Sequence, residues 1–204
     1  MSQQFDVAER QALVLGHPPR IDPLETEQVP EAVWTAMNKI RAGIGLGPLE
    51  ALPEFNATMA KAPDLMFGYL ALSTFLFQGK LSMRDRELAV LRVGWLCRAP
   101  FEWSEHVKIA KRMAGVTDED VERMKVGSGA EGWNAHEAAV IRAVEELFAD
   151  AMISDETWAV LARTLDEQQL LELPILVSLY QGTAYLQNSV RVRLMPGSEG
   201  LFAR

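Results

Sequence analysis

Apolar residues recur at intervals of three and four positions from about residue 30 onward, which is the spacing of helices that bury one face. No clear alternation of apolar and polar residues, the pattern of a half-buried strand, interrupts this spacing before VRVRL at 190–194. The pattern therefore predicts an all-α chain. Its expected helices are 30–40, 53–60, 63–78, 82–97, 101–115, 133–149, 154–164 and 166–189, with one more after Thr117.

Residues with short polar side chains stand where several of these helices are expected to begin. Ser82, Thr117, Ser154 and Asp166 are the predicted N-caps. The run LAVLRVGWLC at 88–97 also fits a buried strand, because valine and tryptophan favour strands. We favour a helix there, since the run and the segment leading into it exceed the usual length of a strand.

Residues 1–29 differ from the rest in being rich in proline and charge. We expect an extended N-terminal arm there, a helical domain over 30–195 and a C-terminal tail over 196–204. An arm of this length often lies over its own domain or over a neighbouring subunit, and its length leads us to expect a homo-oligomer.

The composition and charge of the chain exclude some classes of partner. The 204 residues carry a net charge of −8, and no basic stripe is present, which argues against nucleic acid as the main partner. The longest apolar stretch, 65–77, is shorter than the ~20 residues of a membrane span, and no signal peptide is recognisable. We therefore expect a cytoplasmic protein without a membrane partner. Its single cysteine, Cys97, has no second cysteine for a CxxC pair.

The segment FEWSEHVKIAKRMAG at 101–115 places two ionisable residues on an apolar helix face. At about 100° per residue, Glu102 and His106 fall between Ile109 and Ala110. They are four positions apart and therefore neighbours. On the preceding helix, Glu87 also occupies an apolar side.

Three ionisable residues on buried faces point to proton transfer. A carboxylate buried without a partner loses several kcal/mol or is neutralised, and a histidine pKa near ~6.5 is readily shifted. A Glu–His cluster in a dry pocket is therefore suited to acid–base catalysis. A structural ion pair explains Glu102 and His106 equally well, and Glu87 also fits an ordinary partner of Arg84 or Arg92.

The stretch RDRELAVLRVGWLCRAPFEWSEHVKIAKRMAGVTDEDVERM resembles the central motif of the carboxymuconolactone decarboxylase family, which includes the alkylhydroperoxidase-like proteins. The segments RIDPLE and WNAHEAAVIRAVEELFADAMISDETWAVLARTLDEQQLLELPILVSLYQGTAYLQNSV resemble other parts of its longer members. The resemblance implies an alkylhydroperoxidase-like helical bundle with an extended N-terminal arm. It also implies a dimer, trimer or hexamer.

The peroxidase branch of that family has two cysteines between its glutamate and its histidine. The matching positions here are Glu87, Ala99, Glu102 and His106, so both cysteines are absent. Reduction of peroxide by a dithiol requires a thiolate and a second thiol. That chemistry is not expected, and Cys97 is interpreted as a small buried apolar residue.

The decarboxylase branch implies cofactor-free acid–base chemistry on a small organic acid or lactone, as in aromatic catabolism. His106 is then the expected proton donor, Glu102 its orienting or second acid–base group, and Glu87 sets the charge of the imidazole. An arginine among Arg84, Arg86 and Arg92, with Arg86 preferred, is expected to bind an anionic substrate.

Trp103 and Tyr180 are the other expected substrate contacts. Tyr180 is expected to share a side of the last long helix with Gln181, Tyr185 and Asn188. The three histidines show no metal-ligand spacing, so neither a metal nor a cofactor is expected.

Two rival functions remain open at this stage. One is a thiol-dependent redox protein that uses Cys97, and the other is a non-catalytic binding or scaffold protein.

Overall fold

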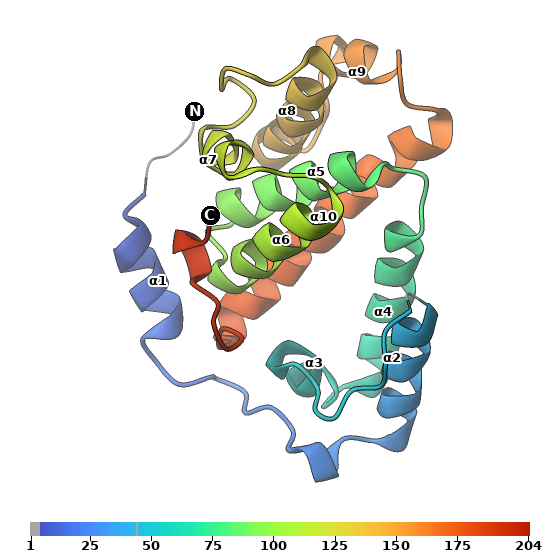
Figure 1. Ribbon diagram of the computed structural model, residues 1–204, viewed down its shortest axis with the longest axis vertical. Coiled ribbons are helices and arrows are strands. Elements are labelled where there is room, and N and C mark those ends of the chain that lie inside the picture. Colours follow the sequence, from blue (N-terminus) through green and yellow to red (C-terminus); the bar gives the residue numbers. More distant parts are fainter. Residues whose placement is uncertain (1–4, 44) are drawn as a thin grey trace.

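The computed structural model describes residues 5–43 and 45–204, and every regular element in these two ranges is a helix (Figure 1). The predicted all-α class is therefore confirmed. The elements are α1 (Val7–Leu15), η1 (Thr26–Gln28), α2 (Glu31–Gly43), α3 (Glu54–Met59), α4 (Pro63–Phe77), α5 (Met83–Leu96), α6 (Pro100–Met113), α7 (Asp118–Val126), α8 (Ala135–Asp150), α9 (Asp155–Leu161), α10 (Glu167–Val190) and η2 (Gly200–Phe202).

The four predicted N-caps are confirmed. Ser82 Oγ accepts a hydrogen bond from the backbone N–H of Asp85 at 3.0 Å, and Ser154 caps α9 in the same way. Thr117 and Asp166 each form a complete capping box, in which side chain and backbone bond reciprocally. Each cap supplies a partner to a backbone donor that the first turn leaves unpaired, worth about 1 kcal/mol.

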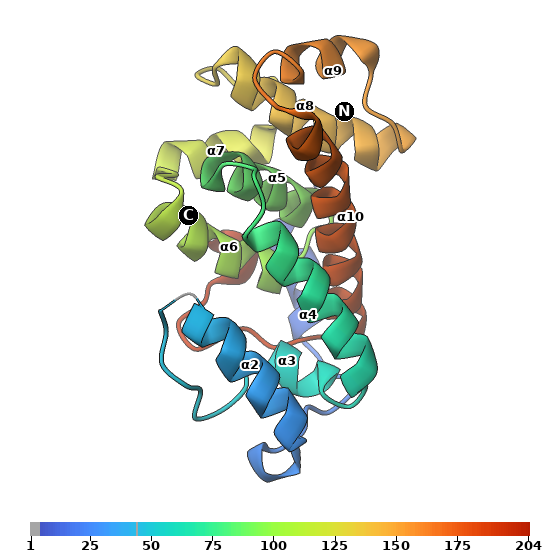
Figure 2. The ribbon, with the colours of Figure 1, turned by 90° about the vertical axis from the view of Figure 1, so that its right-hand side faces the viewer.

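Helix α5 is the central element of the fold. It packs against α6, α7, α8 and α10, and ten consecutive residues from Asp85 to Gly94 are buried (Figures 1 and 2). A helix surrounded on all sides needs apolar residues around its whole circumference, which explains the strand-like run at 88–97. Helix α6 lies directly against Gly94, where a Cβ would be in van der Waals contact with the backbone nitrogen of Trp103 at 3.4 Å.

The buried apolar side chains form two clusters. The larger one joins α5 to α8 and α10, whereas the smaller one holds α2, α3 and α4 together with the end of α10. Figure 2 shows α2–α4 as a separate group of helices beside α6 and α10. The smaller cluster contains Val29, Val33, Phe55, Met59, Ala60, Met66, Val190 and Val192.

The N-terminal arm differs from the expectation of an extended segment. Residues Val7–Leu15 form α1, whose first turn is capped by the side chain of Asp6, and Phe5 and Val7 pack against the larger cluster. The prolines that suggested an extended chain start only at Pro18, beyond this helix. The helix therefore forms within a segment whose overall composition indicated none.

The C-terminal end also departs from the sequence pattern. VRVRL does not form a strand, because α10 continues to Val190 and the described chain offers no second strand to pair with. The tail is not peripheral: Leu201 and Ala203 are buried in the larger cluster.

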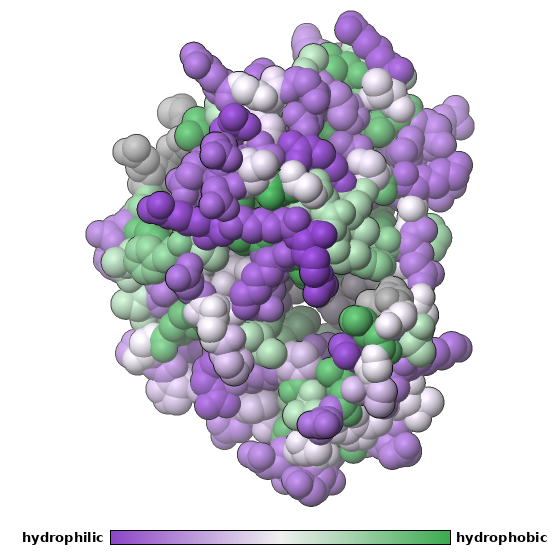
Figure 3. Space-filling view, in the orientation of Figure 1, coloured by the Kyte–Doolittle hydropathy of each residue, from purple (hydrophilic) through white to green (hydrophobic). Residues whose placement is uncertain are grey.

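The face shown in Figure 3 is mostly hydrophilic, with a hollow near its centre between the half that holds α6 and the half that holds α2–α4. Among the described residues, no helix is both long and apolar enough to cross a membrane.

Candidate acid–base site

The three ionisable residues predicted to face the core meet in one cluster. Glu87 comes from α5, and Glu102 and His106 come from α6. Nδ1 of His106 lies 2.8 Å from Oε2 of Glu87, and Nε2 lies 3.1 Å from Oε1 of Glu102. The imidazole is therefore held between two carboxylates, one at each ring nitrogen.

Arg86 and Tyr180 extend the cluster toward α10. The guanidinium of Arg86 donates to Oε1 of Glu87 and to the hydroxyl of Tyr180. The ring of Tyr180 meets the imidazole of His106 edge-on, with ring centroids 5.0 Å apart. The guanidinium also lies over the ring of Phe77, 5.0 Å from its centroid, which places α4 beside the cluster.

Gln187 on α10 completes the contacts of Glu102. Its amide nitrogen donates to Oε2 of Glu102 at 2.7 Å, so both oxygens of this carboxylate are hydrogen-bonded. One turn earlier on α10, the hydroxyl of Thr183 donates to the hydroxyl of Tyr69 on α4 at 3.2 Å. Helices α4, α5, α6 and α10 thus all contribute polar groups to one small region.

Burial and charge together set the protonation of the cluster. Burial alone favours the neutral imidazole, but the charges of Glu87 and Glu102 outweigh it and raise the pKa of His106 to about 9. Burial alone would also raise the pKa of Glu87, but the charges of His106 and Arg86 overcome that effect and lower it. At neutral pH the site therefore contains an imidazolium flanked by carboxylates.

The charges of the cluster cancel, but two of its buried polar atoms have no hydrogen-bond partner among the described residues. Two carboxylates face one imidazolium and one guanidinium, so the four side chains are neutral together. Nε of Arg86 and Oε1 of Gln187 are buried without a hydrogen-bond partner among the described residues. A free donor and a free acceptor at a buried cluster are groups that a polar ligand can satisfy.

The family model for "Carboxymuconolactone decarboxylase family" matches residues 63–146, which include α4, α5, α6 and most of α8. Residues 63–146 are thus similar to this family, and the predicted resemblance is confirmed over that range. No curated protein matches the chain.

Solved structures show the same fold at low sequence identity. An uncharacterised peroxidase-related protein from Ralstonia eutropha JMP134 with an alkylhydroperoxidase core has a TM-score of 0.73 and 14% identity, covering 88% of this chain and 94% of that one. The debrominase Bmp8 in complex with 2,3,4-tribromopyrrole has a TM-score of 0.66 and 19% identity, with 87% and 92% covered. A protein of unknown function from Agrobacterium tumefaciens has a TM-score of 0.60 and 16% identity, with 67% and 94% covered.

Among the residues expected at the site, Trp103 lies elsewhere. It is fully buried, its indole N–H donates to the carbonyl of Ala203 at 3.1 Å, and its ring packs against Trp95. One step along a helix turns a side chain by about 100°, so Trp103 faces the C-terminal tail while Glu102 faces the cluster. The remaining five predicted residues, Glu87, Glu102, His106, Arg86 and Tyr180, lie together.

The expected shared side of Tyr180, Gln181, Tyr185 and Asn188 is also not observed. Gln181 donates to the hydroxyl of Tyr185 at 2.6 Å on the exposed side of α10, and Asn188 donates to the carbonyl of Cys97. The inward side of α10 instead follows the helical spacing 180, 183, 187. That spacing is the sequence signal that would have found Thr183 and Gln187.

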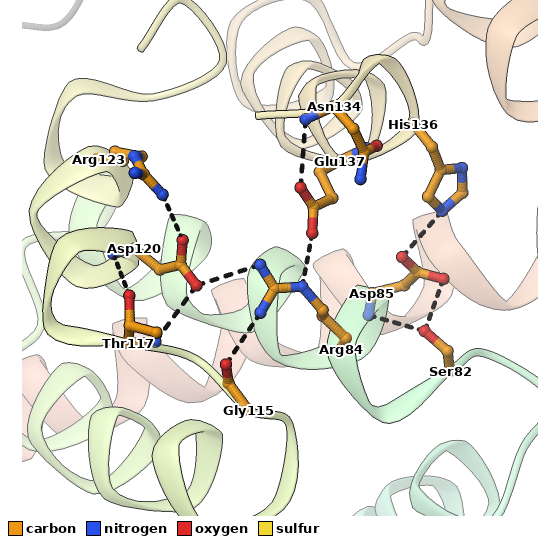
Figure 4. A network of polar contacts seen from close by, with 10 residues as sticks. All are labelled: Ser82, Arg84, Asp85, Gly115, Thr117, Asp120, Arg123, Asn134, His136 and Glu137. Atoms are coloured by element: carbon orange, nitrogen blue, oxygen red, sulfur yellow. Dashed lines mark hydrogen bonds and ion pairs between the residues drawn. The ribbon is translucent and has the colours of Figure 1, made fainter. Parts of the chain in front are cut away.

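The other two candidate arginines have structural partners. Arg84 joins Glu137 and Asp120, and Arg92 pairs with Glu145 at 2.8 Å. Figure 4 shows Arg84 at the centre of a network that links α5 to α7 and α8. Arg86 is therefore the arginine that reaches the acid–base cluster.

Cys97 is buried at the end of α5, as predicted. Burial, with a further contribution from the charge of Glu102, raises the pKa of its thiol to about 12. The reactive thiolate is thus disfavoured at neutral pH. The positions of the two cysteines of the peroxidase branch hold Ala99 and Glu102 in this chain.

Glu87 and Glu102 approach opposite nitrogens of the imidazole, so the three side chains do not converge on a common point. No group of three or more histidine, cysteine, aspartate or glutamate residues within 5–43 and 45–204 has a geometry that would hold a metal ion.

Proposed function

We propose that this protein is a cofactor-independent lyase or isomerase that acts on a small organic acid or lactone by acid–base chemistry. The observation that carries the proposal is the imidazole of His106, buried between Glu87 and Glu102. Such an arrangement keeps a proton on a group that can release it to a substrate and regain it from a neighbouring carboxylate.

In the proposed decarboxylation, the bond between the substrate carboxylate and its α-carbon breaks and CO₂ leaves. The electron pair remains on the substrate as an enolate, and the proton of Nε2–H of His106 forms the new C–H bond. The neutral imidazole then regains a proton from water through Glu102, which lies 3.1 Å away. In an isomerisation, the same two groups move a proton between two carbons.

Arg86 is proposed to bind the substrate, with Tyr180 holding its guanidinium in place. Its Nε carries a proton that no described residue accepts, and Oε1 of Gln187 is an acceptor without a donor. A substrate with one acceptor oxygen and one hydroxyl or acid proton would satisfy both atoms. The ionised carboxylate of a small lactone acid supplies the acceptor, and a hydroxyl elsewhere on the substrate would supply the donor.

The solved structures support a small-molecule ligand. Bmp8, which shares the fold, holds a small ring, 2,3,4-tribromopyrrole, in its complex. The high pKa of the Cys97 thiol does not favour the redox alternative.

The proposal is tested by incubating the protein with a panel of muconolactone-like acids in D₂O. CO₂ release and deuterium at the product carbon are the readouts. His106→Gln should lower turnover by about 10²- to 10⁴-fold, the usual contribution of general acid–base catalysis. The matched control is His136→Gln, whose imidazole is bound by Asp85 and Thr164 outside the cluster and whose loss should leave turnover unchanged.

Equal activity in wild type and His106→Gln would contradict the proposal. If no acid in the panel is turned over but one binds and shifts the His106 resonances, the protein is the non-catalytic binding homologue instead.

The expected homo-oligomer is part of the proposal. Helices α4 and α10 contact each other and leave large apolar side chains in solvent, and Figure 2 shows both on one side of the molecule. An apolar patch of this kind is typical of an interface. The side chains are Leu65, Leu72, Phe75, Leu171, Ile175 and Tyr185.

Sedimentation velocity tests this assembly. The wild-type chain should sediment as an oligomer, and Phe75→Glu and Ile175→Glu should each yield monomers, because a charge in an apolar interface is costly. Phe202→Glu, on a phenylalanine of similar exposure near the C-terminus, is the control and should stay oligomeric. A monomeric wild type would contradict this part of the proposal.

A further inference from the structure

Tyr69 on α4 is a polar residue beside the acid–base cluster that has no part in the reaction described so far. Its hydroxyl lies 3.2 Å from the hydroxyl of Thr183 on α10. Thr183 follows Tyr180 by three positions and precedes Gln187 by four, so these three side chains share the inward side of α10. The phenol of Tyr69 thus reaches α10 between the two residues of that helix that contact the cluster.

The hydroxyl of Tyr69 has unused hydrogen-bonding capacity. Thr183 is its one hydrogen-bond partner among the described residues. The hydroxyl of Thr183 also donates to the carbonyl of Leu179, at 2.8 Å, so its single proton is shared and the contact with Tyr69 is the longer and weaker one. The phenol proton of Tyr69 therefore remains available to a ligand.

The surroundings of Tyr69 keep its phenol protonated. Burial, followed by the charge of Glu102, raises the pKa of Tyr69 to about 12, although the hydrogen bond with Thr183 and the charge of Arg86 act in the opposite direction. Tyr69 is thus able to donate a hydrogen bond at neutral pH. Both Glu102 and Arg86 act on this hydroxyl, which agrees with its place beside the cluster.

The ring of Tyr69 is held by the smaller apolar cluster. Phe55 on α3 meets it edge-on, with ring centroids 5.8 Å apart, and Phe101, the residue before Glu102, lies 6.4 Å from Phe55. The hollow in Figure 3 lies between the half that holds α6 and the half that holds α2–α4. A donor on a fixed ring at this boundary is preorganised for a ligand that enters between the two halves.

We propose that Tyr69 donates a hydrogen bond to the carbonyl oxygen of the substrate and stabilises the negative charge that develops there. When the bond to CO₂ breaks, its electron pair moves onto this oxygen as the enolate forms. Tyr69 keeps its own proton, while His106 protonates the carbon. The inference rests on the proposed function, and it requires a substrate with a carbonyl placed to accept that electron pair.

The kinetics of two matched variants test this role. Tyr69→Phe removes only the oxygen and should lower kcat for muconolactone-like acids by about 10²-fold, because a donor to developing charge acts mainly in the transition state. Its KM should stay within about twofold. Tyr180→Phe, the same change at the phenol that holds Arg86, should instead raise KM. A Tyr69→Phe protein with the kcat of the wild type would overturn the inference.

A second measurement does not require turnover, so it separates a failure of this inference from a failure of the proposed function. 4-Nitrophenolate is a flat ring with an oxyanion, as the enolate is, and its binding to the full chain is followed by absorbance. Tyr69→Phe should weaken that binding by about tenfold, the effect of losing one hydrogen bond to a charged group. Nitrobenzene lacks the phenolate oxygen, and its binding should not change.

The combined results give distinct outcomes. If the wild type turns over no acid but binds 4-nitrophenolate through Tyr69, the proposed reaction fails and Tyr69 stands as an oxyanion donor. Phenolate binding that is absent, or that Tyr69→Phe leaves unchanged, would overturn the inference even if the acids are turned over.

Discussion

Helix α5 contributes an arginine to each of two charged clusters, Arg84 to one and Arg86 to the other. Arg84 joins Glu137 at 2.5 Å, Asp120 at 3.1 Å and the carbonyl of Gly115 at 3.3 Å (Figure 4). Arg86, two residues along, joins Glu87 and Tyr180 beside His106. Both clusters combine arginine with carboxylates, and both connect α5 to other helices.

The two clusters differ in how far the arginine is buried and in whether all its nitrogens have hydrogen-bond partners. The side chain of Arg84 is one-third exposed, and each of its three nitrogens donates to an oxygen, so the network is complete without a ligand. The side chain of Arg86 is 4% exposed, and its Nε remains without a partner. A buried charged cluster with a hydrogen-bonding group left unpaired thus points to a ligand. A partly exposed cluster whose groups are all paired points to a structural role.

The largest expected effect compares one carboxylate from each cluster. Glu87→Gln leaves His106 and Arg86 buried without their common partner, which should lower the free energy of unfolding by about 3–5 kcal/mol. Glu137→Gln retains the helix cap and weakens only a partly exposed ion pair, so the loss should be about 1 kcal/mol. Urea denaturation of both variants measures the difference.

Equal losses in the two variants would show that the clusters are energetically alike and would remove the basis of the comparison. A Glu87→Gln protein that is stable but inactive would strengthen the contrast between the two clusters, because the charge of Glu87 would then be needed for the reaction and not for stability.

The next effect concerns pH. The pKa of His106 is raised from 6.5 to about 9, so its stabilising contribution is complete below about pH 6.5 and is lost as the pH rises through about 9. The lowered pKa of Glu87 acts at the acid end: its contribution is present above the ordinary glutamate pKa and disappears as the pH falls through the lower value of the folded state. NMR titration of the His106 imidazole, assigned with His106→Gln, measures the first transition.

In Glu102→Gln the same imidazole should titrate at a lower pH, because one of its two carboxylate partners is gone. A titration of His106 near its ordinary pKa in the wild type would contradict the buried, doubly paired geometry.

The smallest effect is expected at Cys97. Cys97→Ser should leave turnover within about twofold and reduce stability by about 1–3 kcal/mol, the cost of burying a hydroxyl without a partner. Activity lost in Cys97→Ser and retained in His106→Ala would move the chemistry from the cluster to the thiol.

Much of the fold was predictable because local signals agreed with one another. Ser82 and Thr117 fixed where helices begin, and the apolar spacing fixed how far they continue. Helix α1 was not predicted because residues 1–29 were interpreted as one segment, and the prolines from Pro18 onward indicated an extended chain. The burial of Leu201 and Ala203 in the tail was not predicted, because it depends on contacts with α6 that no short window of sequence contains.

The site was predictable only where its members are close in sequence. Glu102 and His106 were found by their spacing of four on an apolar face, and Glu87 by its apolar side and by resemblance to the family. Gln187 lies 85 residues from Glu102, so only the folded chain brings them together. Trp103 was misplaced because a helical wheel does not say which neighbouring element faces each side.

The division of the interior into two apolar clusters has a consequence for how this protein can change. Tyr180 belongs to the larger cluster with the core of α5 and α6, whereas Tyr69 packs against the smaller one with α2 and α3. The first half of α4, with Met66 and Tyr69, is therefore supported separately from the helices that hold His106, whereas Leu76 near the end of α4 belongs to the larger cluster. Under the proposed function, substitutions around Tyr69 would alter which molecules fit beside the cluster while Glu87, Glu102 and His106 stay in place.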